Sequence, residues 1–360
     1  MTPVLPVSRL KADANKRWGV KAMLIPDGLL SAGELNATGG TCKIVDVILH
    51  IGAHRTGTTT LQVFLSGNQN KLSEIGVGFW GPEKTRAGLF SGLVKPADKI
   101  THDAVLRGQR SCGLIRVELG LLEKAGAGAL IVSEENMIGT MRRNLSEARL
   151  YPDAKARLER FATAFGFHCR RIVLSIRSYD EYWASVLAFL VMRGAPVPDT
   201  GLLDRLVTQP RRWRDVIRDV ADVFPAAEVM VWPFEAIVGQ PERQLALMTG
   251  EPVPAGMTGK RQWHNASASP ERLQGVLCDR GDAGAAKAIP AGAMRWQPFD
   301  PHHITALQAQ YAEDTAWLRN GAGGKATYLE TTTPGQAGAH LPPAHQERGH
   351  FHEQEERRMG

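Results

Sequence analysis

The chain has 360 residues, of which 43% are hydrophobic, enough for one large α/β domain or two smaller ones. No apolar stretch is long enough to span a membrane, and the segment MTPVLPVSRLKADANKRWGV lacks the continuous apolar run of a secretory signal, so we expect neither. The net charge of +6 suits anionic ligands, but no basic stripe interleaved with aromatic residues indicates a nucleic-acid-binding module.

The cysteines indicate reduced thiols. Cys42, Cys112, Cys169 and Cys278 are widely spaced and form no C-x-x-C pair, so neither a zinc site nor a disulfide framework is predicted. We therefore expect a cytoplasmic protein.

The chain divides into three parts by composition. We predict that residues 1–43 form an N-terminal extension whose order the sequence leaves open, and that residues 44–320 form the main domain. The segment 330–360 is polar and poor in apolar residues, so we predict a disordered tail there.

The first predicted strand, residues 44–49, runs directly into the segment HIGAHRTGTTTLQ at residues 50–62. A buried strand, a Gly-flanked turn and a Thr-rich helix start are typical of a phosphate-binding loop. The unpaired N–H groups and the dipole of a helix N-terminus favour an anion, and the glycines let the backbone approach it. The candidate anion-binding residues are Gly52, Arg55, Thr56, Gly57, Thr58, Thr59 and Thr60.

This loop differs from that of nucleoside triphosphatases, which read G-x-x-x-x-G-K-[ST]. Gly52 and Gly57 have the same spacing, but Thr58 stands at the Lys position and the cation is Arg55, inside the loop. We therefore expect the loop to bind a phosphate-like group without the usual magnesium–nucleotide arrangement.

The next segment, residues 76–112, is rich in Gly, Lys and Arg and lacks periodicity, so we predict loops and short helices over the site, where an acceptor would bind.

Residues 129–133 form the second predicted strand, and Glu134 and Glu135 follow its carboxyl end, where ligands of open α/β sheets bind. A carboxylate there can accept a proton from a nucleophile. The alternative is an acidic pair at a helix N-terminus.

Three histidines, His50, His54 and His102, are further candidate bases, although His50, at a strand end, is equally well explained as a buried structural histidine.

The third predicted strand, residues 171–177, ends at Arg177, and a helix is predicted from Asp180 onward. Arg177 and Ser185 are suited to binding a phosphate, because Arg offers paired donors and Ser adds a hydroxyl. The alternative is that neither residue binds a ligand, and that Arg177 is a surface residue at the strand end and Ser185 an ordinary helical serine.

The last third of the domain is predicted mostly as scaffold. Apolar residues from Trp213 to Phe224 recur at helical spacing and residues 228–232 are typical of a strand, so we predict that both segments pack in the core. We predict an amphipathic helix over residues 303–319. Between the strand and this helix, Arg261, Asn265 and Ser267 lie in a polar loop and are weak candidates for contacts to a ligand.

These motifs together resemble sulfotransferases that use 3'-phosphoadenosine 5'-phosphosulfate (PAPS), most nearly the bacterial and carbohydrate-type members. Their phosphosulfate loop reads much like H-I-G-x-x-K-T-G-T-T-x-L-Q, and this chain departs from it at Arg55, which keeps the charge as a wider planar group.

The resemblance assigns roles to individual residues. It implies that the 52–60 loop binds the 5'-phosphosulfate and that Arg177 and Ser185 bind the 3'-phosphate. Matching the family's S-x-E segment to Ser133 implies that Glu135 is the catalytic base, with Glu134 as the alternative. It further implies that Arg55 stabilises the leaving group and that the 261–267 loop closes over the 3'-phosphate and adenine.

We therefore predict a three-layer α/β/α domain with a mostly parallel sheet built from residues 44–51, 129–133, 171–177 and 228–232. Right-handed crossovers would bring the named loops to one edge. The predicted activity is transfer of the sulfuryl group of PAPS to a hydroxyl or amine, most readily of a carbohydrate, without a metal ion. Two alternatives remain: an atypical P-loop kinase using Glu134 and Glu135 as magnesium ligands, or a non-catalytic binder of nucleotide or glycan.

Overall fold

The computed structural model describes residues 44–259, 267–292 and 295–330. Within these ranges six strands form one sheet in the order β2-β3-β1-β4-β5-β6, and every neighbouring pair is parallel. The predicted α/β fold with a mostly parallel sheet is therefore confirmed. The strands are β1 (Asp46–His50), β2 (Val77–Trp80), β3 (Ala129–Ser133), β4 (Cys169–Ile176), β5 (Glu228–Pro233) and β6 (Thr327–Tyr328).

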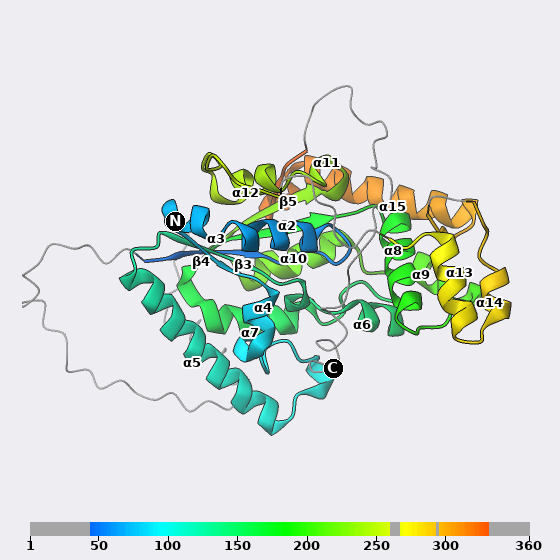
Figure 1. Cartoon of the computed structure of the whole chain (residues 1–360), viewed down its shortest axis with the longest axis horizontal. Coiled ribbons are helices and arrows are strands. Elements are labelled where there is room, and N and C mark those ends of the chain that lie inside the picture. Colours follow the sequence, from blue (N-terminus) through cyan, green and yellow to red (C-terminus); the bar gives the residue numbers. More distant parts are fainter. Residues whose placement is uncertain (1–43, 260–266, 293–294, 331–360) are drawn as a thin grey trace, which may run out of the picture. The chain divides into compact units, whose positions relative to one another are not determined.

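Helices cover both faces of the sheet (Figure 1). Alternate residues of β1 point to opposite faces, so Ile48 packs in one core cluster while Val47 and Leu49 pack in the other. The cluster around Ile48 includes apolar residues of α2 (Thr58–Gly67), α3 (Gln69–Glu74), α11 (Phe234–Ile237) and α12 (Pro241–Thr249). The other cluster includes residues of α5 (His102–Lys124), α6 (Met141–Ser146), α7 (Ala154–Phe165), α8 (Tyr179–Met192), α9 (Thr200–Thr208), α10 (Trp213–Val223), α13 (Pro270–Asp279), α14 (Ala283–Lys287) and α15 (Pro301–Arg319).

The remaining elements are short. They are α4 (Pro82–Lys84), the π-helical turn η1 (Thr85–Leu89), and the 3-10 turns η2 (Ala97–Lys99), η3 (Glu135–Met137), η4 (Gly166–His168) and η5 (Gly321–Gly324). No helix within the described ranges has the length and apolar character needed to cross a bilayer.

The order of the strands places a reversal of winding at β1. The chain adds β2 and β3 on one side of β1 and β4, β5 and β6 on the other, so the direction of winding reverses there. In open α/β sheets, ligands bind beyond the carboxyl ends of the strands at such a reversal. The loops that follow β3, β1 and β4 are thus neighbours at one edge of the sheet.

The four predicted strands and the helices after Arg177 and near residues 303–319 are confirmed, but the expectation for residues 76–112 was wrong in part. That segment contains β2 and the first half of α5 as well as short helical turns. Gly78 interrupts the four-residue strand, and the glycines of α5 blur its helical pattern. The strand β6 was also missed, and it pairs with β5 beyond residue 320.

A close contact between backbones fixes the start of α5. Gly92 has a positive φ of 86°, and a Cβ atom built on it would lie 2.5 Å from the carbonyl oxygen of Ala104 and from the amide nitrogen of Gly108. Neither backbone atom can move without shifting the helix, so only glycine fits at this position.

We predict that Gly92→Ala lowers the free energy of unfolding by about 3 kcal/mol, because it adds both a steric clash and an unfavourable φ. Urea denaturation followed by circular dichroism measures this. Gly275→Ala is the control: Gly275 lies inside α13 with no atom within 4 Å of the added Cβ, and this change should stabilise the protein by about 1 kcal/mol. Equal stability of the two variants would contradict the prediction.

Candidate functional site

The loop after β1 has the backbone conformation of an anion-binding concavity. Gly52, Arg55 and Gly57 have positive φ values of 92°, 62° and 78°. Turns with left-handed residues can direct successive N–H groups toward one point, as in known anion-binding concavities. Gly57 is the N-cap residue of α2 and, having no side chain, caps the helix without a side-chain hydrogen bond. The N-terminus of α2 and its dipole, which favours an anion, therefore lie at this loop.

Strand β4 and the core hold this loop in place. The amide of Ala53 donates to the carbonyl of Ser175 at 2.9 Å, and the hydroxyl of Thr56 donates to the carbonyl of Ala53 at 2.6 Å. Thr56, Thr58 and Thr60 are almost fully buried. These bonds and this burial tie the loop to its own scaffold.

The side chain of Arg55 connects the loop to two distant segments. Its Nε donates to the hydroxyl oxygen of Ser185 at 2.9 Å, and Nη2 lies 3.4 Å from the hydroxyl oxygen of Ser267. The two serine oxygens are 2.8 Å apart. Arg55, Ser185 and Ser267, predicted from three separate motifs, thus form one cluster. The other two residues predicted from the late loop, Arg261 and Asn265, lie outside the described residues.

Arg177 joins this cluster from the end of β4. Its Nη1 donates to the carbonyl of Arg55 at 3.2 Å, and its Nη2 pairs with Glu181 at 2.7 Å. The guanidinium lies over the ring of Phe234, with 4.7 Å between its Cζ and the ring centroid. The residue is only 5% exposed, and its Nε is buried without a hydrogen-bond acceptor in the described structure. A buried donor without an acceptor costs free energy that an incoming anion would recover.

Positive charge accumulates around Arg55. Burial, followed by repulsion from Arg177, Arg193 and Arg295, lowers the pKa of Arg55 to about 10. Burial likewise lowers the pKa of Arg177, against the opposing effect of Glu181. Concentrated, partly dehydrated guanidinium groups bind phosphate or sulfate strongly, since these anions relieve the mutual repulsion.

Glu134 and Glu135 differ in what surrounds them. The carboxylate of Glu134 is buried and accepts bonds from Arg86 Nε at 2.9 Å, Arg86 Nη2 at 2.9 Å, Thr85 Oγ1 at 2.8 Å and the amide of Asn136 at 3.1 Å. The Glu135 side chain keeps 14% exposure. Glu134 therefore has the contacts of a structural residue, whereas Glu135 faces the loop.

Glu135 is held by two side chains that the sequence analysis did not select. Arg86 Nη2 donates to Oε1 at 3.1 Å, and Gln62 Nε2 donates to Oε2 at 3.0 Å. Burial alone would raise the pKa of Glu135, but Arg86, His54 and the hydrogen bonds lower it to about 2. Gln62 closes the loop motif and could have been selected there; Arg86 lies in the aperiodic 76–112 segment and had no signal.

Gly52 lets the loop and Glu135 approach each other. A Cβ atom at Gly52 would lie 3.0 Å from the Cβ atom of Glu135. The amide of Glu134 also donates to the carbonyl of His50 at 3.1 Å, extending the pairing of β1 with β3. The backbone of the anion-binding loop and the carboxylate are thus joined through two adjacent strands.

The histidines differ in environment. Burial lowers the pKa of His50 to about 4, and its Nδ1 bonds the hydroxyl of Ser133 at 2.8 Å, so it is a neutral buried residue. Burial also lowers the pKa of His54, whose Nδ1 and Nε2 lie 2.9 Å from the Tyr151 hydroxyl and 3.3 Å from Asn136 Oδ1. Both ring nitrogens of His54 are therefore occupied. His102 is exposed at the first residue of α5.

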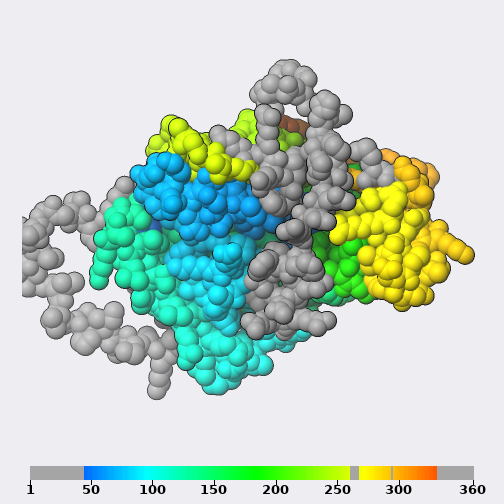
Figure 2. Space-filling model, viewed as in Figure 1, coloured from blue at the N-terminus to red at the C-terminus, as the bar shows by residue number. Residues whose placement is uncertain are grey.

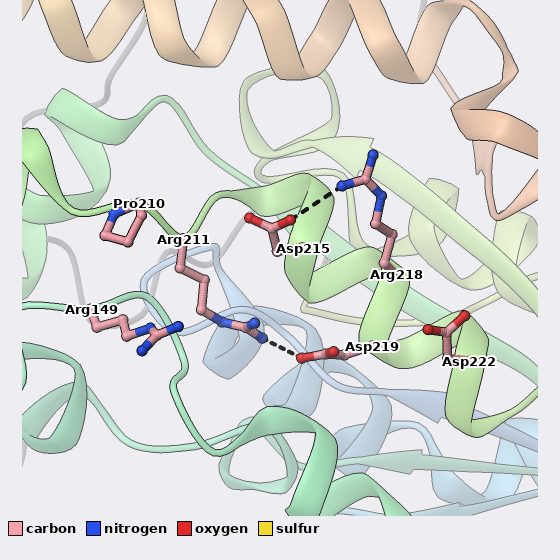
Figure 3. A pocket seen from close by; sticks show the side chains of 7 residues that line it. All are labelled: Arg149, Pro210, Arg211, Asp215, Arg218, Asp219 and Asp222. Atoms are coloured by element: carbon pink, nitrogen blue, oxygen red, sulfur yellow. Dashed lines mark hydrogen bonds and ion pairs between the residues drawn. The ribbon is translucent and has the colours of Figure 1, made fainter.

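A separate cavity of about 330 Å³ lies beside α10 (Figure 3). Its Arg211 pairs with Asp219, and its Arg218 with Asp215 at 3.3 Å, so much of its charge is neutralised internally. It is lined by Arg149, Pro210, Arg211, Asp215, Arg218, Asp219 and Asp222, none of which belongs to the predicted site. Among the described residues, no group of three or more His, Cys, Asp or Glu side chains is placed to hold a metal ion.

Comparison with known proteins leaves the family of this chain open. No protein-family model and no curated protein matches the chain. Among solved structures, a sulfotransferase domain from the curacin biosynthetic pathway is similar, with a TM-score of 0.34 and 13% sequence identity over 75% of this chain and 98% of that domain. A TM-score of this size carries no functional argument, so function has to be argued from the residues of the site.

We predict that Arg86→Met reverses the dependence of stability on acidic pH. In the native protein the lowered pKa of Glu135 stabilises the fold above about pH 4.5, and this contribution is lost as the pH falls toward 2. Without the guanidinium, burial would raise the pKa of Glu135, so acidification should stabilise the variant. At neutral pH the variant should lose about 3–5 kcal/mol of unfolding free energy.

Urea unfolding at a series of pH values tests this prediction. Lys84→Met is the matched control, because Lys84 pairs with Glu118 near the surface and its removal should leave the profile unchanged. A native-like profile in Arg86→Met would show that Arg86 does not set the charge state of Glu135.

Proposed function

We propose that this chain is a sulfotransferase that moves the sulfuryl group of PAPS to an acceptor hydroxyl or amine. The observation that carries the proposal is the cluster of Arg55, Arg177, Ser185 and Ser267 beside the anion-binding loop. A second anion site next to the first suits a nucleotide that carries phosphate at both its 3' and 5' positions.

The loop and the cluster would divide the donor between them. The N-terminus of α2 and the loop amides would hold the 5'-phosphosulfate, while Arg177 and Ser185 would hold the 3'-phosphate. The unsatisfied Nε of Arg177 supports this fit, because it is a buried donor lacking an acceptor. The side chain of Arg55 lies between the two positions and would contact either anion, with its guanidinium reoriented from Ser185 for the leaving group.

Glu135 is the residue that we propose as the base. Its carboxylate is partly exposed and accepts two side-chain bonds, from Arg86 and Gln62, whereas the carboxylate of Glu134 is buried and accepts four bonds. PAPS, when bound, supplies the activated sulfuryl group. The acceptor oxygen or nitrogen forms the new bond to sulfur, the bond from sulfur to the phosphate oxygen breaks, and Glu135 takes the acceptor proton. Arg55 and the loop amides stabilise the charge left on the phosphate.

The low pKa of Glu135 limits how early it can accept that proton. A carboxylate with a pKa near 2 is a weak base, so the acceptor must lose most of its proton affinity by bonding to sulfur before transfer is complete. Carbohydrate hydroxyls satisfy this scheme, and we propose a carbohydrate as the acceptor class. The segment with Thr85 and Arg86, which borders the two carboxylates, would form the acceptor side of the site.

The donor site can be tested by calorimetry. We predict that the protein binds 3',5'-ADP in preference to magnesium ATP, and that Arg177→Ala weakens the binding of 3',5'-ADP about 10- to 100-fold, the cost of one charged hydrogen bond. Arg170→Ala is the control on the same strand, because its side chain is exposed and pairs with Asp46 at the other end of the sheet. Preference for magnesium ATP would favour the kinase alternative.

The proposed base can be tested by turnover of labelled PAPS with a panel of carbohydrate acceptors. Glu135→Gln should lower kcat by about 10²- to 10⁴-fold with little change in the affinity for 3',5'-ADP. Glu134→Gln should instead mainly lower stability. Normal turnover in Glu135→Gln together with a folded, inactive Glu134→Gln would move the base to Glu134. Donor binding without transfer to any acceptor would favour the non-catalytic alternative.

A further inference from the structure

The outward face of α5 carries a stripe of apolar side chains. Leu106, Leu114, Val117 and Leu121 are between 47% and 61% exposed, and they make up half of the large exposed apolar residues within the described ranges. The helix has 23 residues and is therefore about 34 Å long. It lies at the edge of the described fold (Figure 1), and teal side chains of this segment reach the surface in Figure 2. Contiguous exposed apolar surface of this kind marks an interaction site.

The stripe is not needed for the packing of the helix within its own chain. The opposite face of α5 is buried, through Ala104, Gly108, Ser111, Ile115 and Leu119. Two glycines, Gly113 and Gly120, lie within the outward face, and a Cβ atom added to either would meet no atom within 4 Å. Glycine is a poor helix former, so these positions weaken the helix without serving a contact in the described structure. They would let a second helix approach closely.

We propose that α5 packs antiparallel against α5 of a second copy of this chain, across a two-fold axis. A two-fold axis makes any antiparallel register self-complementary, and the register that we propose is the one that brings the opposite charges at the helix ends together. In this register each copy places Asp103 opposite Lys124, Leu106 opposite Leu121, Arg110 opposite Val117, and Gly113 opposite Leu114 of the other copy. The side chain of Leu114 then fits over the glycine of its partner helix.

The charges at the two ends of the helix select the antiparallel direction. Asp103 lies in the first turn and Lys124 in the last, and both are exposed. Asp103 pairs with Arg107 of its own helix, whereas no ion pair of Lys124 is present in the described part of the chain. An antiparallel pair brings each Lys124 to an Asp103. A parallel pair would instead oppose like charges at both ends and place the two Arg110 side chains together.

Sedimentation velocity of the full chain over roughly 1 to 100 µM tests the proposal, since a contact limited to one helix should be concentration-dependent. We expect the native protein to form a dimer and Leu114→Glu and Val117→Glu to be monomeric with unchanged circular dichroism. Ile75→Glu is the control, because Ile75 is 41% exposed on another element, and this variant should remain dimeric. A native protein that is monomeric throughout, or a dimer unaffected by Leu114→Glu, would overturn the proposal.

A charge exchange tests the register. Asp103→Lys and Lys124→Asp should each weaken the dimer about tenfold, because each creates two like-charge contacts across the axis. The double variant restores opposite charges and should dimerise like the native protein. Additive weakening in the double variant would overturn the antiparallel register. The binding of 3',5'-ADP is a separate readout, so failure of the dimer and failure of the proposed donor site are distinguishable.

Discussion

Parallel hydrogen bonding of β1 to β3 on one side and to β4 on the other decides which segments meet at the edge of the sheet. These strands begin up to 123 residues apart along the chain, at Asp46 and Cys169, yet their registers bring His50, Ser133 and Val173 level. Everything that follows the three strands is thereby brought together. The anion-binding loop, the acidic pair and Arg177 are adjacent because their strands are paired, without any long-range contact of their own being required.

The site separates its charges by sign, and this separation determines what each residue can do. Around Arg55, guanidinium groups gather with serines, and Glu181, which pairs with Arg177 and Arg295, offsets only part of their mutual repulsion. Across the loop, Arg86 pairs with two carboxylates whose burial without a partner would be costly. Binding of an anionic donor would lower the free energy of the guanidinium cluster around Arg55. Arg86, in contrast, keeps Glu135 ionised. In the proposed reaction, one half would bind the donor and the other would accept the proton of the acceptor.

The sequence predicted those parts of the fold and site that are local. Mostly apolar runs identified β1, β3, β4 and β5, and the glycine spacing identified the loop. In contrast, β2 is short and contains Gly78, and β6 has two residues, so neither gives a periodic pattern. Arg86 lies 48 residues before Glu134, and its role depends on a contact that no local pattern encodes. The cluster of Ser185 and Ser267 was assembled from separate motifs, but its bond to Arg55 required the fold.

The basicity of Glu135 constrains the order of events more tightly than its position does. Arg86 and Gln62 stabilise the ionised carboxylate, and each would lose part of its interaction if that carboxylate were protonated. In the proposed reaction, proton transfer to Glu135 would therefore have to be driven by the growing acidity of the acceptor as its bond to sulfur forms. An acceptor that moved Arg86 away would make Glu135 a stronger base, because burial would then raise its pKa. Glu134, which shares the same guanidinium, resists that movement, so the acidic pair acts as one unit: Glu134 anchors Arg86, and Arg86 sets the strength of Glu135.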